Sequence, residues 1–393
     1  MVVEITKLDN YGRGICYVDD KITFVLNALP GEKLEIEITK FTKKYNEAIV
    51  KKYISKSSRR IEPICEYYDK CGGCNLMHMS YEDELEFKEQ KIKDIMYKYA
   101  HIENEKVKKI IPNNNLNYRN KVTFKVKNKI GYYKEKSTEI IPINKCYIID
   151  EKINKILDEL NEIDLSNIYE IVIRTGIDED MIVFKGTNID ITNLSTKNII
   201  LFDKDYKVLR GNNYIIDKIG DFKFYISPNS FFQVNKYNVV NLYNKVLEYV
   251  KESSNLLDLY CGTGSIGIYL SGVCKKITGV EINKSSIEYS NRNKELNHLE
   301  NINFVCLDTD EYNIKENFDT IVVDPPRSGL GTKTINYLNE SNCKKIVYVS
   351  CDPLTLARDL KILSENYNVI ELTPVDMFSR TYHCETVCVL ERK

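Results

Sequence analysis

From residue 236 onward, amphipathic segments alternate with short, continuous apolar runs. The segments 236–251 and 284–297 have the periodicity of helices with one apolar face. The apolar runs between and after them are short enough to be buried strands: 255–260, 276–283, 301–308, 318–324 and 344–351. Strands that alternate with helices predict a doubly wound, mostly parallel sheet of the α/β class. Ligands in such sheets bind at the carboxyl ends of the strands.

Residues 1–54 have a different pattern, in which short β-like runs are separated by turns such as 28–32. Several short strands in so few residues predict a small β-barrel. Between 40 and 60 the chain has one acid, Glu47, and eight basic residues. Such a run is usually a solvated surface, although a barrel with a basic flank and aromatics is also typical of oligonucleotide-binding folds. These basic residues and aromatics are Lys40, Lys43, Lys44, Lys51, Lys52, Lys56, Arg59, Arg60, Phe41, Tyr45 and Tyr53.

The stretch between these two regions is mixed. An amphipathic helix is predicted at 80–100, and β-like runs with one helix near 150–162 follow at 118–225. We therefore expect three domains: a small β-barrel, a mixed α+β central domain, and a doubly wound, Rossmann-like domain. Their expected bounds are 1–56, 57–225 and 226–393, with the segment 80–111 packing on the third domain.

Composition narrows the class of protein. The 393 residues carry a formal net charge of −1, which excludes a uniformly basic nucleic-acid binder but permits a basic patch. The first residues lack a signal-peptide pattern, and no stretch is apolar enough to cross a membrane. We expect a soluble, cytoplasmic protein, taken to be a monomer. The twelve cysteines are then unlinked thiols, and those in apolar runs, Cys274, Cys306 and Cys388, are expected in the core. Only the 65–74 segment and Cys351 have chemically suggestive surroundings.

A glycine pattern follows the first strand of the doubly wound region. Gly262, Gly264 and Gly267 form G-x-G-x-x-G, which fits dinucleotides and other adenosine cofactors alike. A nicotinamide cofactor is therefore one alternative.

Acidic residues at the strand ends favour a methyl donor instead. Glu281 can accept both ribose hydroxyls, and Asp308 lies at adenine depth. Asp324 precedes a Pro-Pro pair that stiffens the loop at the reactive end, which hydride transfer does not require. A sulfonium cation would be favoured near Asp324, so the pattern indicates S-adenosylmethionine. The alternative is that these acids, Asp258 included, are unrelated polar residues that end strands and bind no common ligand.

Cys351 ends the fifth apolar run, directly before a segment of helical spacing. A buried core cysteine is the commoner role, but this thiol lies at the predicted ligand edge and beside a helix start, whose dipole lowers the pKa of a thiol. The terminal segment adds His383 and Glu385 before a last apolar run. Together these residues predict pyrimidine methylation. A thiolate adds to carbon 6, carbon 5 takes the methyl group, and a base removes the carbon 5 proton so that the thiol leaves.

The chain resembles the RNA uracil-5 methyltransferases, which make 5-methyluridine in ribosomal and transfer RNA, and the resemblance covers essentially its whole length. The segments that carry the resemblance are 227–235 (SPNSFFQVN), 258–270 (DLYCGTGSIGIYL), 324–330 (DPPRSGL) and 350–360 (SCDPLTLARDL). The resemblance implies that Cys351 is the nucleophile and Glu385 the proton acceptor. It implies cofactor binding by Gln233, Tyr260, Ser265, Glu281, Asp308 and Asp324. The terminal motif departs from the family, with Ser379 for a usual proline and Cys384 for a common valine, and some members carry asparagine at position 265.

A second set of cysteines, Cys65, Cys71 and Cys74, is spaced C-x5-C-x2-C around the glycine pair 72–73. A fourth ligand would come from elsewhere, and Cys146 is the candidate. The resemblance implies a [4Fe–4S] cluster on these four cysteines, as in members that act on ribosomal RNA. From spacing alone a structural Zn²⁺ site is the rival. We expect iron–sulfur in a structural or RNA-positioning role, because the methyl transfer needs no electrons.

The N-terminal barrel resembles the TRAM domain that delivers RNA in part of this family. Barrel and cluster together favour 23S ribosomal RNA as the substrate, with transfer RNA as the alternative. We expect the target uridine in a loop or flipped out, stacked on aromatics near Cys351. Two other functions are open: methylation of an exocyclic nitrogen, which needs no nucleophile, and a non-catalytic, cluster-bearing RNA-binding factor.

Overall fold

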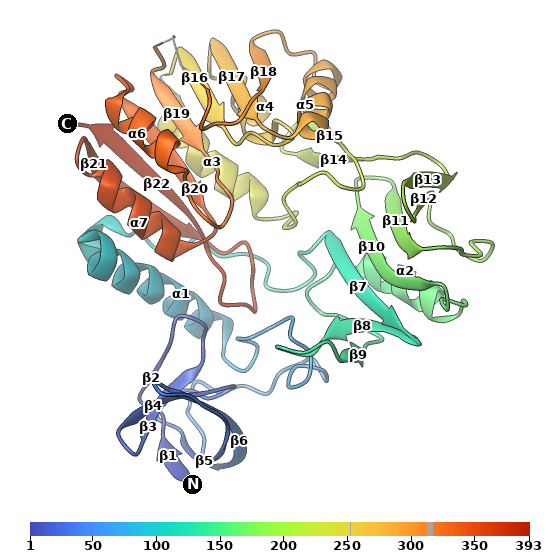
Figure 1. The fold of residues 1–393 in the computed structure, drawn as a ribbon, viewed down its shortest axis with the longest axis vertical. Helices are drawn as coiled ribbons and strands as arrows, with labels where there is room; N and C mark the ends of the chain where they lie inside the picture. The colour runs from blue at the N-terminus through green and yellow to red at the C-terminus, as the bar shows by residue number, and fades with distance from the viewer. Residues whose placement is uncertain (252, 313–316) are drawn as a thin grey trace.

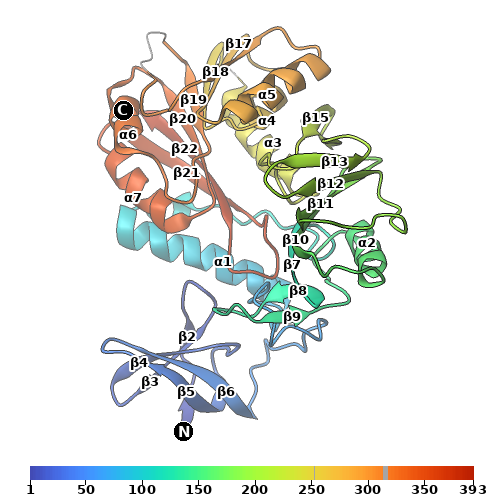
Figure 2. The same ribbon diagram turned by 45° about the vertical axis from the view of Figure 1, so that its right-hand side comes forward.

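The computed structural model describes residues 1–251, 253–312 and 317–393. The described chain forms three parts, each built on a sheet, which follow one another from blue through green to red in Figure 1. A six-stranded N-terminal sheet lies at one end of the molecule, and two seven-stranded sheets lie beyond it. Helix α1 (Tyr81–Ile95) lies between the N-terminal and C-terminal sheets (Figure 2).

The N-terminal sheet has the strand order β1-β5-β6-β4-β3-β2. In β5 (Lys33–Phe41) apolar and charged residues alternate, so Leu34 and Ile36 are buried while Glu35 and Glu37 face outward. This alternation explains why so short a segment closes around its own core. The other strands are β1 (Val2–Glu4), β2 (Lys7–Leu8), β3 (Gly14–Val18), β4 (Lys21–Val25) and β6 (Asn46–Ser55).

The basic run at 40–60 is divided between surface and interior. The lysines of this run are exposed, but the guanidinium of Arg60 is buried and donates to Glu32 Oε2 over 2.8 Å. Arg59 pairs with Asp83 and Glu86 of helix α1. These two arginines therefore connect the N-terminal sheet to the chain that follows it. The exposed lysines carry the positive charge of this face.

Helix α1 begins at Ser80, whose hydroxyl accepts a hydrogen bond of 3.1 Å from Asp83 N. A π-helical turn, η1 (Met96–Ala100), extends it, and His101 in the left-handed conformation ends it. Between residues 101 and 111 only the 3-10 turn η2 (Asn104–Lys106) is helical, so the helix ends near residue 100, as predicted, and the rest of the segment 80–111 is mostly non-helical. The helix packs on α7 and β21, against the C-terminal sheet.

The central sheet has the order β13-β12-β11-β10-β7-β8-β9, and α2 (Glu151–Asn161) covers one face with Ile153, Ile156 and Leu157. A separate hairpin joins it to the C-terminal part. The strands are β7 (Lys121–Lys127), β8 (Lys129–Tyr133), β9 (Ile140–Pro142), β10 (Ile168–Thr175), β11 (Asp180–Gly186), β12 (Asn198–Phe202), β13 (Tyr206–Arg210), β14 (Ile215–Ile219) and β15 (Phe222–Ile226).

The C-terminal sheet has the order β18-β17-β16-β19-β20-β22-β21, in which β22 runs antiparallel to both its neighbours and the first five are parallel. Its strands are β16 (Asn255–Leu259), β17 (Lys276–Glu281), β18 (Ile302–Cys306), β19 (Thr320–Val323), β20 (Lys345–Ser350), β21 (Tyr367–Val375) and β22 (Glu385–Arg392). Its helices are α3 (Val239–Val250), α4 (Ser265–Leu270), α5 (Lys284–Leu296), α6 (Thr332–Glu340) and α7 (Pro353–Leu363).

Helices cover both faces of this sheet, because its strands are apolar on both sides. Leu256 packs in the core with α3, α4 and α5, and its neighbour Leu257 packs in the opposite core with α1, α6 and α7. The predicted fold class is confirmed: a doubly wound domain, a mixed central part and a small N-terminal sheet. From β16 the chain adds β17 and β18 on one side of the sheet and then β19 and β20 on the other, so the strand order changes direction between β16 and β19. Doubly wound folds bind their ligands at this point.

Candidate active site

The loop after β16 is bent by backbone conformations that few side chains adopt. Tyr260, Gly262 and Gly264 all have positive φ, and a side chain at Gly264 would collide with Phe304. Helix α4 begins directly after this loop. The loop therefore exposes its backbone at the carboxyl end of the central strand, as the glycine pattern predicts.

Glu281 closes β17 and lies against this loop. Its Oε2 accepts a hydrogen bond of 3.2 Å from Gly262 N, and its Oε1 accepts one of 2.8 Å from Asn283 N. The carboxylate is thus fixed beside the glycine loop with its remaining lone pairs available. Asp308 lies two residues beyond the end of β18, and its Oδ1 accepts from Asp310 N over 2.9 Å. Both acids lie at the same sheet edge, where the sequence placed them.

Ser265 and Gln233 meet at a tyrosine that the sequence analysis missed. The Tyr243 hydroxyl lies 2.7 Å from Ser265 Oγ, and the side chain of Gln233 is close enough to this hydroxyl to lower its pKa against the effect of burial. Tyr243 belongs to α3, where it reads as one more apolar position of the helix. Only the packing of α3 on α4 brings it to the loop. Tyr260, by contrast, points toward α6, where its hydroxyl lies 3.4 Å from Thr334 Oγ1.

Buried carboxyl groups gather at the middle of the sheet edge. Burial, together with the charges of the nearby Asp324 and Glu281, raises the pKa of Asp258 to about 8. Burial also raises the pKa of Asp324 to about 7. Asp258 Oδ2 accepts a hydrogen bond of 3.0 Å from Gly267 N, which fixes it under the glycine loop. This edge therefore favours a cation in its immediate surroundings.

Sheet register brings Cys351 and Glu385 together. Ser350 of β20 pairs with Thr386 of β22, so the next residue of one strand lies beside the preceding residue of the other. Burial and the charge of Asp324, against an opposing effect of Arg327, raise the pKa of Glu385 to about 8. The insertion of an antiparallel strand next to β20 is what places a carboxyl group beside the thiol.

The pKa of Cys351 is shifted in the direction opposite to the sequence-based prediction. Burial raises it to about 12, and the negative charges of Glu385 and Asp324 add to the effect. The helix start does not compensate, because Asp352 already caps it. The Asp352 carboxylate accepts hydrogen bonds from Leu354 N and Thr355 N at 2.9 and 3.0 Å, so its charge offsets the helix dipole. The predicted lowering of this thiol pKa was wrong.

Two further side chains border the thiol. Arg327, which follows the Pro-Pro pair, is the cation that lowers the pKa of both Cys351 and Glu385, and the sequence analysis gave it no role. His383 stacks against Tyr382 with ring centroids 4.2 Å apart, and burial lowers its pKa to about 4. His383 is therefore neutral at physiological pH.

The loop that leads to Glu385 is held by helix α1. Lys88, fully buried, donates to Glu84 Oε1 and Asp376 Oδ1, each over 2.7 Å, and to Phe378 O over 3.1 Å. Ser379, which stands where the family usually has proline, donates to Asp376 Oδ2 over 2.5 Å. The polar face of α1 therefore fixes the loop 376–384, which carries His383 and precedes Glu385.

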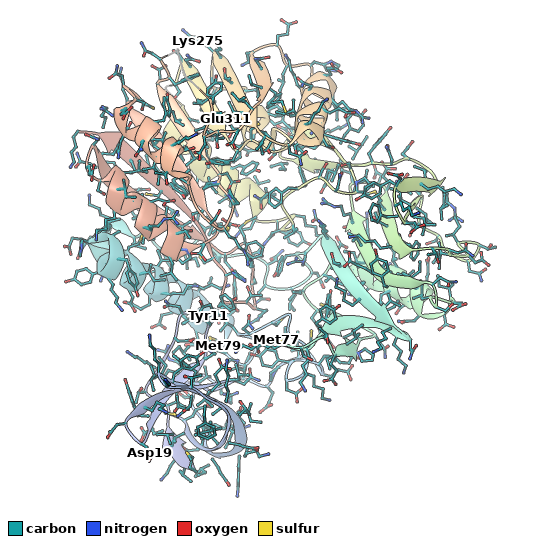
Figure 3. The ribbon with its side chains drawn as sticks, viewed as in Figure 1. Tyr11, Asp19, Met77, Met79, Lys275 and Glu311 are labelled. Atoms are coloured by element: carbon teal, nitrogen blue, oxygen red, sulfur yellow. The ribbon has the colours of Figure 1, made fainter. Side chains whose placement is uncertain are left out.

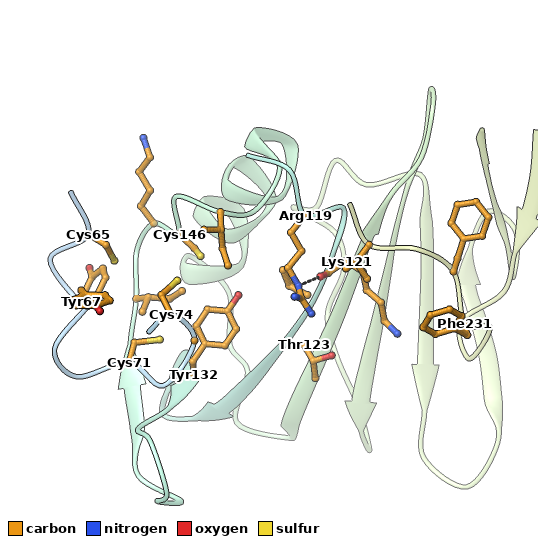
Figure 4. Close-up of a pocket in the computed structure, with 18 residues that line it drawn as sticks. Cys65, Tyr67, Cys71, Cys74, Arg119, Lys121, Thr123, Tyr132, Cys146 and Phe231 are labelled. Atoms are coloured by element: carbon orange, nitrogen blue, oxygen red, sulfur yellow. Dashed lines mark hydrogen bonds between the residues drawn. The ribbon is translucent and has the colours of Figure 1, made fainter. Parts of the chain in front are cut away.

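The four cysteines of the central part line one cavity of about 390 Å³, together with Phe231. Figure 4 shows Cys65, Cys71, Cys74 and Cys146 at one end of this cavity and Phe231 at the other. Burial, with the charges of the neighbouring thiols, raises the pKa of Cys74 and raises that of Cys146 to about 11. Within the described ranges, no group of three or more His, Cys, Asp or Glu side chains is arranged to hold a metal ion.

Cys306 is exposed at the end of β18, although the sequence reads it as a core residue. Its Sγ lies 3.6 Å from Ile282 O. Cys274 and Cys388 are buried, as expected. The described part of the chain has no helix long and apolar enough to span a bilayer.

This fold and this acid-lined sheet edge are typical of one class of protein, the S-adenosylmethionine-dependent methyltransferases. A solved tRNA (uracil-54, C5)-methyltransferase from Pyrococcus abyssi, in complex with S-adenosyl-L-homocysteine, superposes with a TM-score of 0.85 at 30% identity, covering 99% of this chain and 100% of that one. The chain belongs to the tRNA (Uracil-5-)-methyltransferase family, whose sequence model matches residues 174–393. The TRAM domain model matches residues 1–51. The resemblance stated above is thus confirmed.

Full-length relatives support the same class. A Clostridium tetani protein is 37% identical, with 98% of this chain and 95% of that protein covered. A protein of Caldanaerobacter subterraneus subsp. tengcongensis is 35% identical, with coverages of 99% and 97%. Both carry the name of uncharacterized RNA methyltransferases.

Proposed function

We propose that this protein methylates carbon 5 of a uridine in RNA through a covalent bond between Cys351 and carbon 6. The observation that carries the proposal is the pairing of Ser350 with Thr386, which sets the Cys351 thiol beside the buried carboxyl group of Glu385. A nucleophile and a base that adjoin each other at the ligand edge are what this reaction needs. An exocyclic-nitrogen methyltransferase would need neither.

In the proposed reaction, S-adenosylmethionine supplies an electrophilic methyl group on a sulfonium cation. The Cys351 thiol first releases its proton to solvent. The thiolate sulfur then donates an electron pair to carbon 6, and the electrons of the carbon 5–carbon 6 double bond move toward the carbon 4 carbonyl. Carbon 5 then bonds the methyl group, whose former bonding pair stays with the donor sulfur. Glu385 removes the carbon 5 proton, the ring double bond forms again, and the bond between carbon 6 and Cys351 breaks.

Residues around the glycine loop fit the donor. Glu281, held by Gly262 N, is proposed to accept the ribose hydroxyls, with Asp308 near the adenine. The pKa values of Asp258 and Asp324 are raised by burial, so a neighbouring positive charge would favour their ionised forms. Such carboxylates suit a sulfonium better than a neutral ligand. The other proposed cofactor-binding residues are Gln233, Tyr260 and Ser265.

For the four cysteines we propose a [4Fe–4S] cluster, with Zn²⁺ as the alternative. The donor chemistry suits either, because four thiols line one cavity and their raised pKa values would fall beside a metal cation, although the described residues do not hold three of these thiols in a metal-binding arrangement. Cys65, Cys71, Cys74 and Cys146 are the proposed ligands, and the proposed role is structural. We also propose three domains: an RNA-binding barrel at residues 1–56, a central domain at 57–225 and a catalytic domain at 226–393.

The identity of the RNA has two candidates. The combination of barrel and cysteines led us to 23S ribosomal RNA. However, the solved protein that covers 99% of this chain is described as a tRNA (uracil-54, C5)-methyltransferase, so overall length and the presence of an N-terminal barrel do not exclude transfer RNA. We keep ribosomal RNA as the first candidate and transfer RNA as the second.

The test of the mechanism uses RNA that contains 5-fluorouridine, in which fluorine blocks proton loss and traps the adduct. The wild-type protein with donor should form a denaturation-resistant complex with this RNA, and Cys351→Ala should form none. Cys306→Ala is the matched control, because Cys306 is exposed at the same sheet edge. Methylation by Cys351→Ala would favour nitrogen methylation, and binding without any adduct in the wild type would favour a non-catalytic factor.

The substrate test uses total RNA from cells that lack the protein. The RNA is incubated with labelled donor and enzyme, separated by size and digested to nucleosides. Label in 5-methyluridine from the large ribosomal RNA supports the first candidate. Label confined to transfer RNA would overturn it in favour of the second.

A further inference from the structure

Tyr11, in the loop between β2 and β3, reaches from the N-terminal sheet to the catalytic loop. Its ring meets the ring of Tyr382 edge-on, with centroids 5.2 Å apart at an interplanar angle of 82°. Tyr382 in turn stacks on His383. Tyr11 nevertheless remains 49% exposed. Figure 3 shows Tyr11 on the side of the N-terminal sheet that faces the rest of the chain, opposite Asp19.

Tyr11 and Tyr382 line two cavities at once. The larger, of about 630 Å³, lies between the N-terminal sheet and the cysteine segment, and Arg13 and Lys136 are among its lining residues. The smaller, of about 40 Å³, is lined by Cys351 as well as by the two tyrosines. The two rings therefore stand between a groove and the nucleophile.

The groove has the chemistry of a nucleic-acid surface. Arg13 lies over the Tyr11 ring at 5.4 Å, although its guanidinium is also paired with Asp9 at 2.7 Å and with Glu47 at 3.6 Å. Lys136 forms an ion pair with Glu47 at the surface. Such surface pairs contribute little to stability, so Lys136 can exchange the carboxylate of Glu47 for an RNA phosphate. Cations outnumber acids among the residues that line the groove: Arg13, Lys70, Lys134 and Lys136 against Asp69 and Glu135.

We propose that Tyr11 and Tyr382 form a stacking platform for an unpaired RNA base that neighbours the uridine at Cys351, with the strand continuing into the larger groove. This inference rests on the proposed function and assigns it a strand path. Single-stranded RNA is the occupant that fits, because bases stack on tyrosine without sequence preference while the backbone follows cations. The alternative is that the Tyr11–Tyr382 contact only docks the N-terminal sheet.

The direct test is binding of a short single-stranded RNA of alternating uridine and 2-aminopurine, whose fluorescence falls when the base stacks on an aromatic ring. The wild type should quench this probe, and Tyr11→Ala should weaken its binding about ten-fold and restore its fluorescence. Tyr11→Phe should behave as the wild type, since the ring is kept. Tyr17→Ala is the matched control, because Tyr17 lies on the same sheet, is 60% exposed and lines neither cavity.

Kinetics on total RNA give a second readout. Tyr11→Ala should raise KM for RNA about ten-fold and leave kcat close to the wild-type value, because the chemical groups are untouched. Equal probe binding and quenching by wild type and Tyr11→Ala would overturn the platform, whatever the chemistry of Cys351. Failure of the proposed function shows separately, as loss of the 5-fluorouridine adduct in the wild type while the probe still stacks.

Discussion

Lys88 Nζ lies 2.7 Å from Asp376 Oδ1, and both side chains are completely buried. The two residues are 288 positions apart, so the pair ties helix α1 to the loop that precedes Glu385. Glu84, Tyr81 and Ser379 complete the hydrogen bonds of this cluster. A buried charge pair of this kind holds geometry as long as every partner is present.

Lys88→Met should therefore destabilise the protein strongly, by about 3–5 kcal/mol, because it leaves the Asp376 carboxylate buried without a cation, while Glu84 retains its pair with Arg380 at 3.5 Å. Denaturant unfolding measures the change. Lys93→Met is the control: Lys93 pairs with Glu89 on the same helix but is 24% exposed, and its loss should change the free energy of unfolding by less than about 1 kcal/mol. Equal effects of the two substitutions would contradict the role assigned to the buried cluster.

Adduct formation should accelerate as pH rises from about 6 to 9. The pKa of Cys351 is raised to about 12, so its thiolate fraction grows throughout this range. Release of the methylated product should follow ionisation of Glu385, whose pKa is raised to about 8, and should be slow below that pH. Single-turnover assays at several pH values separate the two steps. An adduct rate that is flat over this range would contradict the raised thiol pKa.

Glu385→Gln should bind RNA, transfer the methyl group and stall as a covalent complex, because no base remains to take the carbon 5 proton. Denaturing gels with unmodified RNA would show the trapped species, and turnover should fall by about a thousand-fold or more. Glu391→Gln provides the comparison, since Glu391 lies on the same strand with its side chain 52% exposed. Free turnover by Glu385→Gln would exclude it as the base.

Asp324→Asn should weaken binding of S-adenosylmethionine about ten-fold more than binding of S-adenosylhomocysteine, because only the first carries the sulfonium charge. Calorimetry with both ligands makes the comparison. In the wild type, the preference for S-adenosylmethionine over S-adenosylhomocysteine should diminish below about pH 7, because Asp324 becomes protonated. Asp308→Asn should weaken both ligands alike. An equal loss for both ligands in Asp324→Asn would remove the sulfonium from its vicinity.

Protein purified without oxygen should contain iron and sulfide, with broad visible absorption. Zinc in their place would support the alternative metal. Cys74→Ala should lose the metal and lower the melting temperature, whereas Cys306→Ala should change neither, since that thiol is exposed and lies outside the cavity. A metal content unaffected by Cys74→Ala would refute these ligands.

Much of the C-terminal sheet was predictable because its strands are short apolar runs that end in polar residues. Glu281, Asp324 and Cys351 could be placed on one edge from the chain alone, since parallel strands must present their carboxyl ends together. Tyr243 could not be found this way. A tyrosine on the apolar face of a helix looks like any core residue until the neighbouring helix is in place.

The burial of charged residues between 60 and 95 could not be predicted, for another reason. The charges of α1 suggest a solvated face, yet Glu84 and Lys88 are buried because Asp376 arrives from the far end of the chain. Arg60 likewise loses its surface role to a pairing with Glu32. Periodicity reports which residues share a face, but not what covers that face.

The chain by itself determined the fold class, the acids at the strand ends and the position of the thiol that we propose as the nucleophile, because these depend on local patterns of apolar and polar residues. Tertiary structure alone decided that β22 enters beside β20, that Glu385 therefore adjoins Cys351, and that the pKa of this thiol is raised. It also decided the meeting of Tyr11 with Tyr382. Burial and the approach of distant charges set each of these outcomes, and neither quantity is a property of a short segment.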